Sequence, residues 1–140
     1  MSRKYLLETG FLLALNPNDR NHDWAMGILS KAKKGELKIC ISPAAPIEIS
    51  LMLRSRGVGD DIIAEVFKAM DDAISLYTEP EYCSLTLRHL AYAAELRSKY
   101  QGLTFFDSVH AALAITNRLI YLDLDTVVRN VVESENRVLI

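Results

Sequence analysis

The most informative stretch of the sequence is residues 103–115. It consists of Leu103-Thr104-Phe105-Phe106-Asp107-Ser108-Val109-His110-Ala111-Ala112-Leu113-Ala114-Ile115. Thr104, followed three residues later by Asp107, predicts a capping box at a helix start, with the acid in the first turn, where the helix dipole favours negative charge. The residues after Asp107 are almost all apolar, which predicts a helix that is buried on most faces. Asp107 is therefore either only a capping residue or one of several carboxylates that meet at the N-terminus of a core helix.

The length and composition predict one globular domain spanning residues 1–140. A chain of 140 residues buries about two thirds of its unfolded surface on folding. Half of the residues are hydrophobic and 24% are charged, which is an ordinary balance for a globular protein. The formal net charge of −2 excludes an overall basic footprint for nucleic acid but does not exclude a local basic patch.

The sequence predicts a cytoplasmic protein without a membrane anchor. The longest apolar runs, Phe11–Leu15 and Val109–Ile115, are too short to cross a bilayer. Residues 1–4 lead directly into a strand-like run without a cleavage site, so we expect no signal peptide. Cys40 and Cys83 lack metal-type spacing, and Cys40 falls within an apolar strand. We expect both to be reduced thiols.

Strands and helices are predicted to alternate along the chain. We predict strands at residues 4–8, 37–41, 74–78, 119–122 and 137–140, and helices at residues 9–15, from 21 or 23 to 34, 43–56, 60–73, 84–100, from 104 to about 116, and 126–132. Ser42 is expected to cap the helix that begins at Pro43, with Ile47 and Leu51 pointing inward. Such an alternation predicts a three-layer α/β/α sandwich around a mostly parallel sheet.

Acidic residues fall where this topology brings chain segments together. Glu8 and Asp123 end predicted strands, Glu48 lies on a helix that follows a strand, and Asp107 lies in the first turn of its helix. In parallel sheets, ligands bind outside the carboxyl ends of the strands. Carboxylates gathered there repel one another unless a cation is present, and oxygen ligands suit Mg²⁺ or Mn²⁺. Spacing alone carries little weight, because acids at the ends of elements are common.

Several segments together resemble the PIN-domain family, in the family's order and over nearly the whole chain. They are Leu6–Leu15, the loop from Pro17 to His22 that leads to Ala25, Ile41–Pro43 with Glu48, Leu103–Ala114, and Tyr121–Asp125. The segment around Asp107 is the most specific match, and the one around Asp123 is the least specific. The resemblance implies a metal-dependent ribonuclease, plausible as the toxin half of a toxin–antitoxin pair.

The resemblance also implies roles for individual residues. Matched position by position, the catalytic acids are Glu8, Glu48, Asp107 and Asp123, and the metal ligands are Glu8, Asp107, Asp123 and Asp125. Asp125 is either an auxiliary ligand or a replacement for Asp123. Thr9 matches a small polar position beside the first acid, and Arg54 and Arg56 are candidates for RNA contacts. The implied reaction is attack on an RNA phosphodiester by water that Mg²⁺ or Mn²⁺ activates. The implied partners are RNA, an antitoxin protein and a second copy of the chain, with residues 60–73 and 84–100 as candidate surfaces.

Two departures from the family pattern favour a second interpretation. The family usually has Asp where this chain has Glu8, and it usually has threonine or serine before the last acid, where Tyr121 and Leu122 stand here. The alternative is therefore a weakened or inactive PIN-like module that binds RNA or protein. A third interpretation, a receiver-type phosphoryl-transfer domain, is disfavoured because no lysine follows Lys99.

Other conspicuous side chains are given structural interpretations. His110 lies one helical turn after Asp107, and we expect it to be structural or to line the rim of the site, because the site chemistry favours oxygen ligands. Phe105 and Phe106 are expected in the core rather than as base-stacking platforms.

Overall fold

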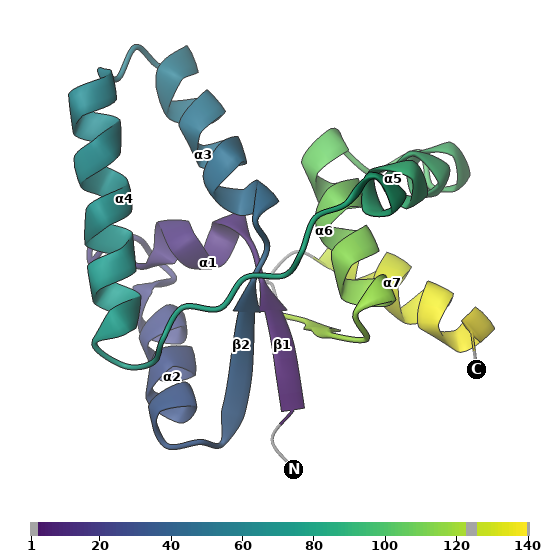
Figure 1. The fold of residues 1–140 in the computed structure, drawn as a ribbon, viewed down its shortest axis with the longest axis horizontal. Coiled ribbons are helices and arrows are strands. Elements are labelled where there is room, and N and C mark those ends of the chain that lie inside the picture. The colour runs from purple at the N-terminus through teal and green to yellow at the C-terminus, as the bar shows by residue number, and fades with distance from the viewer. Residues whose placement is uncertain (1–2, 123–125, 140) are drawn as a thin grey trace.

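The computed structural model describes residues 3–122 and 126–139 of the chain (Figure 1). In chain order the elements are β1 (Arg3–Leu7), α1 (Thr9–Ala14), α2 (His22–Lys33), β2 (Leu37–Ile41), α3 (Ala44–Ser55), α4 (Asp60–Ser75), α5 (Leu87–Lys99), α6 (Phe105–Thr116), β3 (Ile120–Tyr121) and α7 (Thr126–Leu139).

The three strands form one parallel sheet in the order β2-β1-β3. β1 is central and pairs along its whole length with β2, from Arg3 beside Leu37 to Leu7 beside Ile41. Tyr5 and Leu6 pair with the two residues of β3 on the other side. The carboxyl ends of β1 and β2 therefore lie side by side, which brings the residues that follow them to one edge of the sheet.

Alternating side chains of the strands divide the core into two layers. Leu6 and Cys40 point into a cluster with residues of α5, α6 and α7. Their neighbours Leu7 and Ile41 point to the opposite face, into a cluster with residues of α1, α2 and α3. Figure 1 shows α1–α4 on one side of the strands and α5–α7 on the other. The predicted α/β/α sandwich is confirmed.

Helix α6 is the most deeply buried helix among the described residues. Every residue from Ser108 to Ile115 is buried. Its start is fixed by the predicted capping box: the Asp107 amide donates to Thr104 Oγ1 at 3.2 Å, and the Thr104 amide donates to Asp107 Oδ2 at 3.4 Å. The fully buried body prevents rotation of the helix, so the direction in which its first two turns present side chains is fixed as well.

The strand predictions for residues 74–78 and 137–140 are wrong, because residues 74–75 end a helix and residues 76–78 form a turn, and residues 137–139 are helical, while Ile140 lies outside the described residues. Helix α4 continues to Ser75, with Ile74 buried beneath it. Helix α7 continues to Leu139, and its buried residues Val128, Val131, Val132 and Glu135 recur at helical spacing. Short apolar runs do not distinguish a strand from a helix segment by periodicity alone.

Packing also overturns the predicted orientation of α3. Ile47 and Leu51 are 52% and 55% exposed, whereas Ala45 and Ile49 are fully buried. The buried residues of α3 are Ala44, Ala45 and Ile49. Phe105 was expected in the core but is 55% exposed, because it lies in the first turn of α6, before the buried stretch begins.

No helix in the described parts of the chain is long and apolar enough to cross a membrane.

Candidate metal centre

Glu8 directly follows β1 and caps the next helix. Its Oε1 accepts a hydrogen bond from the Gly10 amide at 2.7 Å, so the carboxylate satisfies one of the free amides at the start of α1. Although acidic, the residue is buried. The extra methylene of glutamate thus reaches back to the backbone of its own helix while the carboxylate stays at the carboxyl edge of the sheet.

Glu48 approaches the same place from the second turn of α3. Its Oε1 accepts hydrogen bonds from the Thr9 hydroxyl and from His110 Nε2, the latter at 3.2 Å. Burial opposes ionisation of this half-buried carboxyl, but the hydrogen bonds from His110 and Thr9 outweigh it and hold the pKa of Glu48 below its ordinary value. The group is therefore an anion at neutral pH.

His110 connects the core to the acids. Its ring is fully buried, with Nδ1 2.7 Å from the hydroxyl of Ser42, which is also fully buried. A carboxylate only accepts hydrogen bonds, so Nε2 donates to Glu48, and in a neutral ring Nδ1 then accepts from Ser42. The predicted capping role of Ser42 is wrong: Pro43 is the N-cap of α3, without a side-chain bond, and the Ser42 hydroxyl orients His110 instead.

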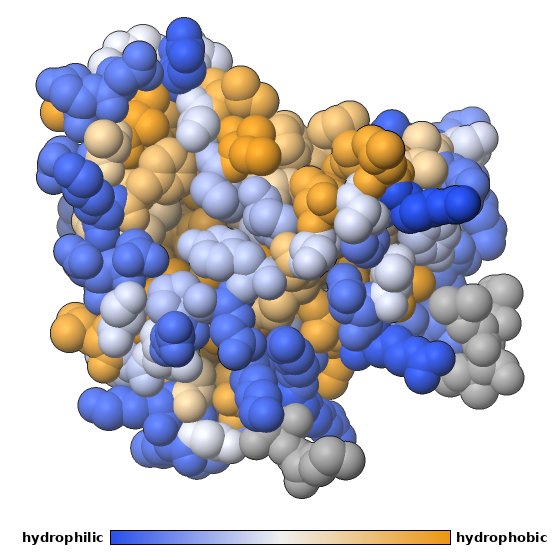
Figure 2. Space-filling model, viewed as in Figure 1, coloured by the Kyte–Doolittle hydropathy of each residue, from blue (hydrophilic) through white to orange (hydrophobic). Residues whose placement is uncertain are grey.

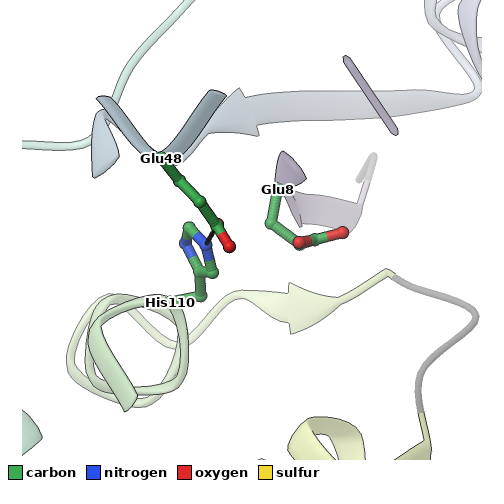
Figure 3. Close-up of side chains that lie close together, drawn as sticks. All are labelled: Glu8, Glu48 and His110. Carbon is green, nitrogen blue, oxygen red and sulfur yellow. Dashed lines mark hydrogen bonds and ion pairs between the residues drawn. The ribbon is translucent and has the colours of Figure 1, made fainter. Parts of the chain in front are cut away.

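Glu8, Glu48 and His110 lie close together, with Glu48 in contact with His110 and Glu8 beside them (Figure 3). One ligand atom from each lies within 4.8 Å of the other two. Oxygen ligands lie at about 2.0–2.1 Å from Mg²⁺, so a separation of this order is comparable with that of two carboxylate oxygens on one ion. His110 Nε2 cannot donate to Glu48 and ligate a metal at the same time. The donor set therefore fits a hard divalent cation held by carboxylates, with His110 orienting one of them.

The structure does not bring all of the predicted acids into this cluster. Asp107 is outside it; the half-buried carboxylate is bonded to the Thr104 amide, one turn before His110 on the same face of α6. Asp123 and Asp125 lie outside the described residues. Leu122, the last described residue before them, donates its amide to the Leu6 carbonyl at 3.1 Å, which places it beside the end of β1.

The predicted RNA contacts are spread differently. Thr9 is buried and belongs to the cluster through its bond to Glu48. Arg54 and Arg56 are exposed at the far end of α3, and Arg54 lies about 9 Å along the helix axis from Glu48.

Sequence reasoning did not identify the contact that orients Glu48. His110 was expected to be structural or at the rim, and it is a core residue whose ring reaches Glu48. One feature of the sequence could have indicated this contact: His110 is a polar ring within an apolar helix, three residues after an acid. A buried imidazole needs hydrogen-bond partners for both nitrogens. Nothing in the local sequence indicated that Ser42 would be one of them.

A parallel α/β/α sandwich with carboxylates gathered at the carboxyl ends of its strands is a fold class suited to binding a divalent cation. A family model for the PIN domain matches residues 5–133. The chain belongs to the PIN-domain family, whose members are generally nucleases that use divalent metals.

A solved structure supports the fold assignment. The chain is similar to the crystal structure of PAE2754 from Pyrobaculum aerophilum, with 20% sequence identity, a TM-score of 0.59, and coverage of 99% of this chain and 98% of that one. At this identity the likeness bears on the fold alone. No curated protein matches the chain at a significant level.

Proposed function

We propose that this protein is a metal-dependent ribonuclease that hydrolyses RNA phosphodiester bonds. The observation that supports this proposal most strongly is the convergence of Glu8, Glu48 and His110 at the carboxyl edge of the sheet in a chain of the PIN-domain family. We propose that Glu8 and Glu48 of this cluster hold the metal, that Asp107, Asp123 and Asp125 are further ligands, and that Glu8, Glu48, Asp107 and Asp123 are the catalytic acids.

The chain's own residues orient the anionic groups. Thr9 and His110 hold Glu48 ionised and in one orientation, and Ser42 holds the His110 ring. The Gly10 amide holds Glu8. A bound Mg²⁺ or Mn²⁺ would lower the pKa of a water and stabilise the charge that develops on the phosphodiester. Because the carboxylates are fixed before binding, little reorganisation is required of them.

A second candidate function follows from the bonds that the acids already make. Glu8 caps α1 and Asp107 belongs to the capping box of α6, so both carboxylates have structural roles without an ion. A PIN-like module that binds RNA or protein but cleaves nothing would have the same two bonds. Cleavage assays separate the two candidates.

The test is RNA cleavage by the purified protein with Mg²⁺ or Mn²⁺, with and without EDTA. We expect cleavage that EDTA abolishes and that Asp107→Asn and Glu48→Gln each reduce by at least about 100-fold, the scale seen when one preorganised electrostatic group is removed. Glu65→Gln is the matched control, because Glu65 is exposed on α4 and forms a surface ion pair with Lys68, and it should cleave like the wild type. RNA binding without metal-dependent cleavage would favour the module.

The protein partners are also part of the proposal. We propose a cytoplasmic protein that forms a homodimer and is neutralised as a toxin by an antitoxin protein. Exposed apolar residues supply surface for such contacts: Ile47 and Leu51 on α3 and Leu87 on α5, the last 85% exposed. Figure 2 shows hydrophobic surface along α3 and beside α5–α6, on both sides of the carboxyl ends of the strands. Sedimentation of the purified chain tests the dimer.

A further inference from the structure

Two thiols outside the metal centre lie almost in bonding contact. Cys40 is in β2 and only 3% exposed, and Cys83 is half-buried in the segment between α4 and α5. Their sulfur atoms are 2.6 Å apart, about half an ångström longer than a disulfide bond of about 2.05 Å. Both are free thiols, and they are 43 residues apart in the sequence.

Backbone pairing holds the two cysteines in register. Tyr82 forms an isolated parallel bridge with Ile41. The Ile41 amide donates to the Glu81 carbonyl at 2.7 Å, and the Cys83 amide donates to the Ile41 carbonyl at 3.3 Å. Cys40 precedes the bridged residue on one strand and Cys83 follows it on the other, so both side chains point to the face opposite Ile41. Both belong to the core layer of α5–α7.

The local environment makes one of the two thiols acidic. The hydrogen bond from Cys83 lowers the pKa of Cys40 to about 7 against the opposing effect of burial, and Lys4 contributes in the same direction. The same bond, together with burial, raises the pKa of Cys83. The thiolate is the nucleophile in disulfide exchange. The buried member of the pair is therefore the one prepared to attack, and the accessible member is the one that an external reagent reaches.

We propose that Cys40 and Cys83 are a reversible redox site that closes to a disulfide with a low-molecular-weight disulfide as oxidant. Cys83 first passes its proton to the Cys40 sulfur and attacks the reagent as a thiolate, forming a mixed disulfide and releasing one reagent thiolate that takes up a proton from solvent. The Cys40 sulfur then attacks the Cys83 sulfur, the S–S bond of Cys83 to the reagent breaks, and the second thiol leaves with the Cys40 proton. The pair loses two electrons and two protons, and the reagent is reduced to two thiols.

Closure would fasten the segment around Tyr82 to the edge of the sheet. The bond encloses α3 and α4 in a covalent loop, and a cross-link of this length restricts the unfolded chain. Cys40 is also two residues before Ser42, which holds His110. We therefore expect the oxidised protein to be more stable than the reduced protein. The added cross-link lies at the end of β2, close to Ser42 and the candidate metal centre.

The experiment equilibrates the full chain with oxidised and reduced glutathione and counts thiols in the unfolded, alkylated product. We expect the oxidised protein to lose two hydrogen atoms in intact mass, to give a non-reducing peptide that joins Cys40 to Cys83, and to melt on the order of 10 °C higher than the reduced form. Dithiothreitol should reverse all three changes. Cys83→Ser should remain folded, because its side chain is half-buried, and should show neither the cross-link nor the shift in melting temperature.

Two results would overturn the proposal. One is a wild-type protein that keeps both thiols after equilibration with oxidised glutathione. The other is a stable glutathione adduct on Cys83 that does not convert to the internal bond. Both are independent of the nuclease assay, because the readouts are mass and melting temperature.

Discussion

The bond between Ser42 and His110 permits a sharp test of how the core supports the candidate metal centre. Both residues are fully buried, and the hydroxyl lies 2.7 Å from Nδ1. Replacing either residue by alanine leaves the other with an unpaired polar atom that water cannot reach. A buried polar group without its partner costs about 1–3 kcal/mol. We therefore expect Ser42→Ala to lower the free energy of unfolding by about 1–3 kcal/mol.

His110→Ala has a second cost. It removes a large side chain from the centre of α6 as well as orphaning the Ser42 hydroxyl, so we expect a loss of about 3–5 kcal/mol. In the double variant neither residue leaves an unpaired partner. The double variant should therefore be more stable than the sum of the single losses predicts, by about 1–2 kcal/mol.

Urea unfolding monitored by circular dichroism measures all four corners of this cycle. Strict additivity would refute the reasoning, because it would mean that the two buried groups do not depend on each other. A variant matched in shape separates stability from function. His110→Gln places an amide where Nε2 stands and cannot reach Ser42 as Nδ1 does, so we expect it to be destabilised but to retain more cleavage activity than His110→Ala.

Three further predictions concern packing, pH and metal. Ile49→Ala should cost about 2–5 kcal/mol because Ile49 is fully buried, whereas Leu51→Ala, at a residue that is 55% exposed, should change stability by less than about 1 kcal/mol in the same urea experiment. The hydrogen bond from Lys99 holds the pKa of Glu135 below its ordinary value despite burial, and bonds from Tyr100 and Tyr92 act in the same direction. The stability that ionised Glu135 contributes is therefore present above the ordinary glutamate pKa of about 4.3. It is lost as the pH falls through the pKa of Glu135 in the folded protein. Glu135→Gln should accordingly flatten the loss of melting temperature between about pH 5 and pH 3, and an unchanged slope would contradict the assignment. Saturating Mn²⁺, at about 100 times its dissociation constant, should stabilise the wild type by about 2.7 kcal/mol, a gain that Glu48→Gln should reduce and Glu65→Gln should not.

The sequence by itself determined the elements whose signals are local. The capping box of Thr104 and Asp107 depends on residues three positions apart, and the strand at residues 37–41 is an apolar run bounded by a glycine turn and a proline. The alternation of such segments was sufficient to predict the α/β/α sandwich, and the family resemblance carried the order of the acids. Local signals were insufficient at residues 74–75 and 137–139, where short apolar runs predicted strands and the structure has the ends of α4 and α7.

The tertiary structure decided which side chains are buried and which distant residues they contact. Helix α3 has apolar residues on more than one face, so its periodicity did not show that Ile49 rather than Ile47 would be buried. His110 meets Ser42 across 68 residues and Glu48 across 62, and Cys40 meets Cys83 across 43. Contacts of this kind depend on the register of a parallel sheet and the rotation of packed helices, and neither is specified by the residues adjacent in sequence. Each candidate acid can therefore be identified from the sequence. Which acids come into contact, and which residue orients each of them, depends on the tertiary fold.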